Sequence, residues 1–357
     1  MKTILSLILA LGLPASQLPD TDNLPINRIQ VIGSHNSYKQ AIDPALFKAF
    51  QQKDSVSASK IDYDHIGIVD QLNMGLRNLE IDVYSDEKGG RYAHPKGLDM
   101  VPDQPAFDPE GKMKLPGFKM LHIPDLDFRS HYLTLDDCLE AMRKWSEAHP
   151  DHTPVFITLE AKGRAAQNNG LASSETFDES AFNELDKVLT EKLGKNHIIT
   201  PDIARGKHET LESAVLSNSW PTVKNAKGKF LFLLDDHGAK RDMYVAGHPS
   251  LKGRVMFVCA DPGQPEAAMM IRNNPKDPEI AGLVKKGYII RTRADSDTRQ
   301  ARENDKSGFE AACGSGAQII TTDYYLKSTH FKSDYAVSFE GGKYFRANPL
   351  FGTAVGR

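Results

Sequence analysis

Histidines, carboxylates and an asparagine follow the ends of short apolar runs in this chain of 357 residues. His35 and Asn36 follow the first run, and the second run carries Glu80 and Asp82. Alternate residues of a strand point to the same side, so we expect these two carboxylates to project together. Histidines and carboxylates gathered in one place can move protons and stabilise developing charge.

Two further runs complete this set. The third run ends in His122, and the fourth ends in Glu160, with Lys162 two positions later. The three carboxylates and the Asn36 carbonyl form an oxygen-rich set without a thiolate, which suits a hard cation. We expect Ca²⁺ rather than Mg²⁺, because an exported protein meets abundant calcium and the ligand number is generous. Zinc would instead require the histidines as ligands, whereas calcium leaves His35 and His122 for proton transfer.

A single acid at a strand end is more often a helix cap or an ion-pair partner than a metal ligand. Buried carboxylates on neighbouring strands, however, are costly unless a positive charge compensates them. Four successive runs that end in such residues therefore favour a site over coincidence.

Eight apolar runs must position these residues, at 28–35, 76–84, 118–123, 154–162, 229–236, 254–261, 287–295 and 317–324. Continuous apolar runs of this length are typical of strands buried on both faces. Amphipathic segments at 133–149, 180–194 and 278–287 predict helices between them. Alternating strands and helices predict an α/β protein with a parallel sheet, and eight strands predict a single (β/α)₈ TIM-like barrel domain.

An open doubly wound sheet is the alternative fold. It would place a Gly-rich phosphate loop after the first strand, where this chain reads GSHNSY. In a barrel, the loops that follow the strands surround the active site. We therefore expect the long irregular segments 85–117 and 237–253 to overhang it.

Composition narrows the class of protein. The 44 Lys and Arg against 47 Asp and Glu give a net charge of −3, which argues against a nucleic-acid-binding surface. With 40% hydrophobic and 25% charged residues, the chain is neither disordered nor fibrous. The cysteines are too few and too scattered for a disulfide framework; they are Cys138, Cys259 and Cys313.

The first residues have the layout of a secretory signal peptide. Lys2 precedes an apolar run from Ile4 to Leu13 that is too short to span a bilayer, and no other stretch approaches transmembrane length. We therefore predict a signal peptide at 1–17, a barrel domain at 24–357, and a secreted or periplasmic protein. A monomer is the default expectation.

Four segments, VIGSHNSY, NLEIDVY, MLHIPDLDF and FITLEAK, resemble successive motifs of the phosphatidylinositol-specific phospholipase C superfamily, above all its calcium-dependent bacterial and fungal branch. The segments IIRTRADSD and IITTDYY extend this resemblance over most of the chain. It implies a distorted TIM-like barrel that acts on phosphatidylinositol, or a related inositol phospholipid, at a membrane or micelle interface. Attack of the inositol 2-hydroxyl on phosphorus would release diacylglycerol and leave a cyclic or linear inositol phosphate.

The resemblance also implies roles for individual residues. His35 would stabilise the charged pentavalent phosphorus, and His122 would protonate the leaving oxygen, although His94 and His131 lie nearby in the sequence. Lys162 would contact the phosphate or the inositol. The implied calcium ligands are Asn36, Glu80, Asp82 and Glu160.

Further polar residues lie near the last two runs. Arg291 and Arg293 share a face of the seventh run, and Asp323 ends the eighth. An arginine pair can hold a phosphate or a sugar hydroxyl with two hydrogen bonds; the alternative is a structural ion pair of Arg293 with Asp295 or Asp323. Tyr325 is expected either to stack on a substrate ring or to plug the barrel.

Two other functions remain open. A glycerophosphodiester phosphodiesterase has the same barrel, paired carboxylates and a divalent ion, but it begins with His-Arg-Gly and follows its third-strand histidine with Asp. Here the chain reads His-Asn-Ser, and His122 precedes Ile. A non-catalytic barrel that binds inositol lipids or glycans would have lost a ligand or a histidine, and none is missing.

Overall fold

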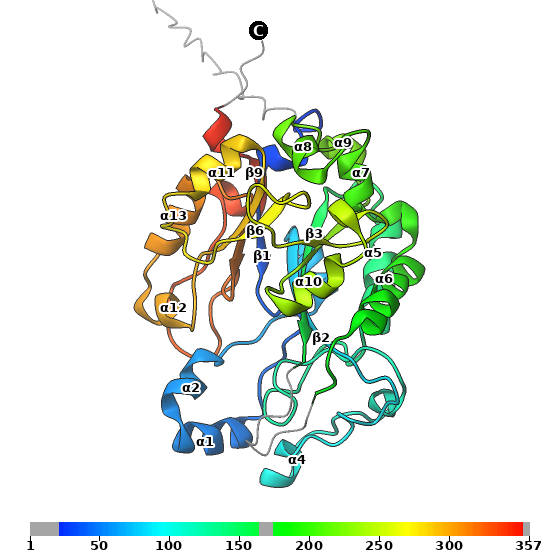
Figure 1. The fold of residues 1–357 in the computed structure, drawn as a ribbon. Coiled ribbons are helices and arrows are strands. Elements are labelled where there is room, and N and C mark those ends of the chain that lie inside the picture. Colours follow the sequence, from blue (N-terminus) through cyan, green and yellow to red (C-terminus); the bar gives the residue numbers. More distant parts are fainter. Residues whose placement is uncertain (1–20, 164–173, 353–357) are drawn as a thin grey trace, which may run out of the picture.

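The computed structural model describes residues 21–163 and 174–352, which form a barrel of parallel strands surrounded by helices (Figure 1). The strands pair in the order β5-β4-β3-β2-β1-β8-β7-β6, and a parallel bridge between Cys259 and Met269 brings the two ends of this order together. The barrel is therefore nearly closed, as predicted. Its strands are β1 Ile29–Ser34, β2 Asn78–Tyr84, β3 Val155–Lys162, β4 Phe230–Leu234, β5 Phe257–Val258, β6 Met269–Ile271, β7 Ile289–Arg293 and β8 Ile319–Thr322.

Helices surround the barrel and extend beyond the carboxyl ends of its strands (Figure 1). The α-helices are α1 Pro44–Lys53, α2 Ser55–Lys60, α3 Ile68–Met74, α4 Gly97–Met100, α5 Leu135–Ala148, α6 Glu179–Leu193, α7 Pro201–Arg205, α8 Leu211–Leu216, α9 Val223–Ala226, α10 Ala239–Val245, α11 Ile280–Lys286, α12 Arg299–Glu303 and α13 Ser307–Ser315. The 3₁₀ helices are η1 Ile26–Arg28, η2 Lys112–Lys114, η3 Lys195–His197, η4 Pro249–Leu251, η5 Glu340–Gly342 and η6 Pro349–Phe351.

The three amphipathic segments form helices α5, α6 and α11, which confirms their prediction. Helix α5 begins after Thr134, whose hydroxyl oxygen accepts a hydrogen bond from the Asp137 N–H at 3.2 Å. The negative charges of Asp136 and Asp137 in its first turn interact favourably with the positive end of the helix dipole. Its buried face then packs on the outside of the sheet.

One predicted strand differs. The run 118–123 is apolar like the others, but Lys119 pairs antiparallel with Tyr84 at the end of β2 and with Thr134. It forms a short excursion beyond the barrel, and β3 takes the place next to β2. The strand that brings the barrel to eight is instead β6, which the sequence did not predict. Its three residues are too few to give a periodic signal.

Strand β1 pairs with the next strand in the sequence and with two strands from the last part of the described chain. It pairs in parallel with β8 and, at Gly33 and Asn78, with β2, while β9 (Phe345–Ala347) runs antiparallel to its first half. A Cβ on Gly33 would lie 2.2 Å from the backbone oxygen of Asn78. The close approach of β1 and β2 therefore requires glycine at this position.

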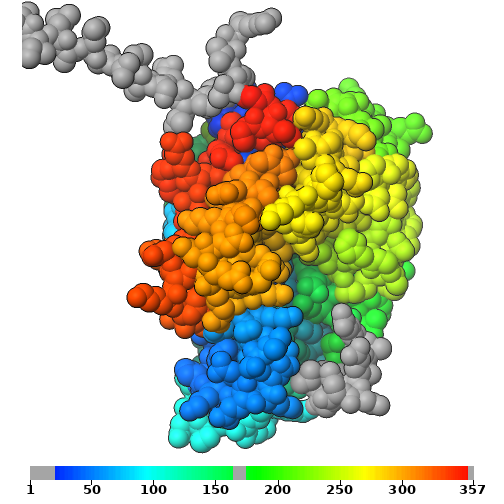
Figure 2. Space-filling model, turned by 90° about the vertical axis from the view of Figure 1, so that its left-hand side faces the viewer, coloured from blue at the N-terminus to red at the C-terminus, as the bar shows by residue number. Residues whose placement is uncertain are grey.

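Helices α1 and α2 lie against the loops that follow β7 and β8, as the adjoining blue and orange surfaces of Figure 2 show. The Thr298 hydroxyl donates to the Ser59 carbonyl at 2.7 Å, and His330 contacts Asp62 at 2.6 Å and Asp64 at 3.0 Å. These two carboxylates raise the pKa of His330 to about 9. The ionic contacts of His330 with Asp62 and Asp64 therefore join the loop after β8 to the segment that follows α2.

The core is formed by strand and helix residues between the sheet and the outer helices, and Cys138 and Cys259 lie in it. All three cysteines are free. Within the described ranges, no helix has the length and apolar character needed to cross a membrane. The predicted signal peptide lies outside the described residues.

Candidate active site

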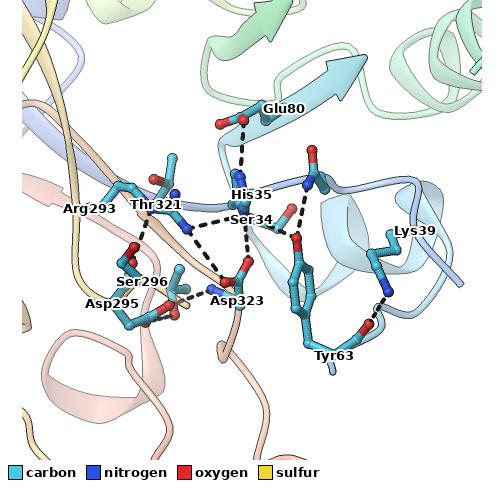
Figure 3. Close-up of polar contacts among 12 residues, drawn as sticks. Ser34, His35, Lys39, Tyr63, Glu80, Arg293, Asp295, Ser296, Thr321 and Asp323 are labelled. Carbon is cyan, nitrogen blue, oxygen red and sulfur yellow. Dashed lines mark hydrogen bonds and ion pairs between the residues drawn. The ribbon is translucent and has the colours of Figure 1, made fainter. Parts of the chain in front are cut away.

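His35, which directly follows β1, lies at the centre of a polar cluster at the carboxyl ends of the strands (Figure 3). Its Nδ1 is 2.8 Å from Oδ1 of Asp323, after β8, and its Nε2 is 3.5 Å from Oε1 of Glu80, in β2. The Asp323 carboxylate is the nearest group to Nδ1, so the hydrogen of a neutral ring belongs on Nδ1. Nε2 then remains as a proton acceptor.

The surroundings of His35 keep the ring neutral. Burial lowers the pKa of His35 well below its usual range, and the Arg293 charge adds to this shift. The Arg293 Nη2 atom lies 3.2 Å from His35 Nδ1 and 3.5 Å from Asp323 Oδ2. The Asp323 N–H donates to Asp295 at 2.9 Å, so a second carboxylate fixes the first. The structure therefore contains the ion pair of Arg293 with Asp323, which the sequence offered as the alternative to a contact with phosphate.

Three charged side chains lie together at the ends of β2 and β3. Asp82 pairs in register with Glu160, and the Lys162 Nζ is 3.0 Å from Asp82 Oδ2 and 2.8 Å from Glu160 Oε2. The Asp82 carboxylate is fully buried, and the Lys162 contact is an ion pair rather than a well-aligned hydrogen bond. Burial raises its pKa to about 7, although Lys162 opposes the rise.

The other two predicted ligands have partners of a different kind. Glu80 forms an ion pair with Arg291 of β7, a buried side chain that also donates to Asn273. Asn36 has a φ of 49°, in the left-handed region that asparagine tolerates better than most residues. Its Nδ2 donates to the Tyr63 hydroxyl at 2.8 Å.

His122 lies on the excursion after β2 and not at the end of a barrel strand. Its Nδ1 is 2.7 Å from Oδ2 of Asp127, and the Lys39 Nζ is 3.3 Å from the other oxygen of that carboxylate. A charge on His122 lowers the pKa of both Asp82 and Asp323, so the three groups share one electrostatic environment. The excursion therefore carries His122 to the barrel mouth.

The two neighbouring histidines have other positions. The His94 side chain is 68% exposed and contacts only the similarly exposed Asp99 among the described side chains. The His131 Nε2 donates to the His65 carbonyl at 2.7 Å, which ties two loops together. Neither belongs to the cluster around His35, and the structure thus favours His122 as the second histidine.

Tyr325 lies in the wall of the barrel mouth. Its ring stacks on His65 with centroids 5.4 Å apart, and its hydroxyl accepts a hydrogen bond from the Ile66 N–H at 3.3 Å. Another aromatic residue, Tyr63, contacts a catalytic candidate directly, since its hydroxyl is 3.3 Å from His35 Nδ1.

Sequence reasoning missed three residues of the cluster. Tyr63 and Lys39 belong to no recognisable pattern, because they meet only when the loops after β1 fold over each other. Asp127 lies in the segment MLHIPDLDF, five positions after His122, and this spacing within one short segment was the available signal.

No group of three His, Cys, Asp or Glu side chains in the described ranges is arranged as a metal site. The residues nevertheless fit a calcium ion, because the Asp82 carboxylate is buried beside Glu160 with the Lys162 ion pair as its compensating contact. A hard cation prefers such oxygens, and a buried carboxylate needs a positive charge nearby. Lys162 supplies that charge in this structure.

A nearly closed barrel with histidines, carboxylates and an arginine gathered at the carboxyl ends of its strands defines a barrel enzyme with acid–base chemistry. The family model described as phosphoinositide phospholipase C, Ca²⁺-dependent, matches residues 24–349. The chain belongs to this family of calcium-dependent phosphoinositide phospholipases C, which confirms the resemblance read from its motifs.

Solved structures are similar in fold. The calcium-dependent phosphoinositol-specific phospholipase C of a Gram-negative Pseudomonas sp., in its myo-inositol complex, is 16% identical with a TM-score of 0.51, over 92% of this chain and 96% of that one. The calcium-dependent phosphatidylinositol-specific phospholipase C of Streptomyces antibioticus is 17% identical with a TM-score of 0.52, over 84% and 95% of the two chains. No curated protein matches the sequence.

Proposed function

We propose that this enzyme cleaves phosphatidylinositol, or a related inositol phospholipid, to diacylglycerol and inositol phosphate with the help of calcium. Family membership supports the reaction class. The observation that carries the proposal is the position of His35 at the barrel mouth, with Nδ1 on Asp323 and Nε2 directed to the side of Glu80. This arrangement gives one ring nitrogen a fixed proton and leaves the other to accept one.

The proposed reaction is an internal displacement at phosphorus. The inositol 2-hydroxyl oxygen forms a bond to phosphorus, and its proton passes to His35 Nε2. The bond between phosphorus and the glycerol oxygen breaks, and His122 gives a proton to that oxygen. Burial lowers the pKa of His35, so the ring is neutral and its Nε2 can accept a proton, whereas the sequence suggested a role in charge stabilisation.

The calcium ligands that we propose are Asn36, Glu80, Asp82 and Glu160. A bound calcium ion would lower the pKa of the attacking hydroxyl and neutralise the phosphate. Because Arg291 is buried on Glu80, Arg293 is the arginine best placed to face a substrate phosphate next to His35.

The surface around the mouth supports contact with a lipid layer. Helices α1, α2 and α4 lie at the same end of the barrel (Figure 1). Exposed apolar side chains on these helices and on nearby loops would gain free energy in a membrane or micelle; they are Val56, Met100, Leu115 and Leu326. We propose a secreted or periplasmic monomer with a signal peptide at 1–17 and a barrel domain at 24–357.

The test is hydrolysis of phosphatidylinositol in mixed micelles, with added calcium and with a chelator. We expect calcium-dependent release of diacylglycerol, lost in His35→Ala and in Glu80→Gln. Cleavage of glycerophosphoinositol while the lipid stays intact would replace the proposal with a glycerophosphodiester phosphodiesterase. Binding of the lipid without turnover, unchanged in His35→Ala, would indicate a non-catalytic barrel.

A further inference from the structure

His122 is joined to a buried ion pair that the proposed reaction has not used. Its Nδ1 contacts Asp127 Oδ2 at 2.7 Å, and the Lys39 Nζ lies 3.3 Å from Asp127 Oδ1. Both Asp127 and Lys39 are 1% exposed. A buried pair of charges is expensive to desolvate, so it contributes little to stability by itself.

The same lysine reaches the neighbourhood of the first histidine (Figure 3). Its Nζ donates to the Tyr63 carbonyl at 2.5 Å and lies 4.7 Å from the centre of the Tyr63 ring. The Tyr63 hydroxyl is 3.3 Å from His35 Nδ1. Lys39 therefore contacts both Tyr63, which lies against His35, and Asp127, which lies against His122.

Asp127 holds His122 through its backbone as well as its side chain. The Asp127 carbonyl accepts hydrogen bonds from the His122 N–H at 3.2 Å and from the Ile123 N–H at 3.0 Å. This tight turn fixes the position of the histidine backbone without the carboxylate. The carboxylate is then free to set the orientation and the protonated nitrogen of the ring.

We propose that Asp127 is the positioning residue of His122 and that Lys39 holds Asp127 in place. This inference rests on the proposed function. The carboxylate accepts the Nδ1–H, so Nε2 is the nitrogen left to face the leaving glycerol oxygen. His122 Nε2 has no hydrogen bond to a described residue, and the side chain is 18% exposed, in contrast to the buried Asp127.

The first test is Asp127→Asn, which keeps the shape of the side chain and the backbone turn. We expect kcat to fall about 100-fold while KM changes less than about twofold, because the ring that donates the proton is no longer held by the carboxylate. A mere loss of folded enzyme would lower the amount of active enzyme and leave the kcat of the folded fraction unchanged.

Lys39→Met should lower kcat less than Asp127→Asn does. It removes the charge that holds the Asp127 side chain, while the carboxylate and its backbone turn remain. The other groups near His122 stay the same in both variants: the Tyr84 hydroxyl on its carbonyl, and the charges of Asp82, Asp323 and His35. A purely structural role would reduce the amount of folded enzyme without changing the tautomer of the His122 ring.

Asp99→Asn is the matched control, because His94 and Asp99 make the same type of contact at 2.9 Å on the open surface. We expect wild-type kinetics for this variant. If Lys39→Met fails to fold, the kcat and KM of Asp127→Asn alone decide, and Lys39→Met with Asp127→Asn restores folding by removing both charges.

A readout independent of activity is the ¹⁵N NMR spectrum of the histidine rings in the unliganded enzyme. The neutral ring of wild-type His122 should carry its proton on Nδ1, and this preference should weaken in Asp127→Asn. An Nε2–H tautomer in the wild type, or an unchanged kcat and tautomer in Asp127→Asn, would overturn the inference. If the NMR result holds while the wild type leaves the lipid intact, the proposed function fails and the positioning role of Asp127 does not.

Discussion

The two sides of the barrel differ in how completely their strands are paired. Strands β2 and β3 are in register from Asn78 and Phe156 to Tyr84 and Lys162. Strand β5 has only two residues, and it meets β6 through one bridge, from Cys259 to Met269. A cavity of about 250 Å³ lies between the ends of these weak strands.

The polar cluster lies beside the longer ladders. Glu80, Asp82 and Glu160 occupy β2 and β3, and His35 follows β1, which pairs with β8 at four positions and with β2 at one. Catalysis requires groups held to within fractions of an ångström, so a long ladder of hydrogen bonds is a better support than an open seam. The β2–β3 and β1–β8 ladders therefore support the cluster better than the seam between β5 and β6 could.

The largest expected difference between the polar cluster and the cavity beside β5 and β6 is in the loss of activity when a histidine is removed. His35→Ala should lower kcat about 10³-fold, because it removes a proton acceptor from the reacting site. His237→Ala, at the cavity beside β5 and β6, should leave kcat within about twofold of wild type. Equal losses in the two variants, measured on phosphatidylinositol micelles, would show that the weak side also carries chemistry.

The next effect concerns stability where β1 meets β2. Gly33→Ala forces a Cβ into the Asn78 backbone and should destabilise the fold by about 3 kcal/mol. Gly282→Ala is the matched control: nothing lies within 4 Å of the added Cβ in helix α11. It should stabilise by about 0.5–1 kcal/mol. Denaturant midpoints decide, and a neutral Gly33→Ala would show that these strands separate easily.

Calcium should stabilise the well-paired side directly. At a concentration about 100 times its Kd, the ion should add about 2.7 kcal/mol, which corresponds to an increase in Tm of about 5 °C. Asp82→Asn should abolish this increase, whereas Asp261→Asn, an exposed carboxylate after β5, should keep it. A calcium-dependent Tm in Asp82→Asn would place the ion elsewhere.

The smallest effect is on local opening. Amide hydrogens of β6 should exchange about tenfold faster than those of β2, since a short strand beside a seam opens at lower free energy. Hydrogen exchange followed by mass spectrometry measures both segments in one sample. Uniform protection around the barrel would contradict the contrast from which these predictions derive.

The sequence predicted the barrel because strands buried on both faces leave long apolar runs such as 154–162. It misassigned 118–123, because an apolar run does not reveal whether its partner strand is parallel or antiparallel. Alternation within β2 was enough to place Glu80 and Asp82 together. It was not enough to predict the contact of Lys39 with Asp127, which depends on how two loops fold over each other.

Because β1 pairs with β8, the polar cluster around His35 can form only late in synthesis of the barrel. Its partners β8 and β9 come at the far end of the chain, and Asp323 is 288 positions after His35. At about 5–20 residues per second, the ribosome delivers that carboxylate some 15–60 s after the histidine. During synthesis, His35 therefore emerges long before the carboxylate that contacts its ring, and the polar cluster can form only after β8 and Asp323 have been made.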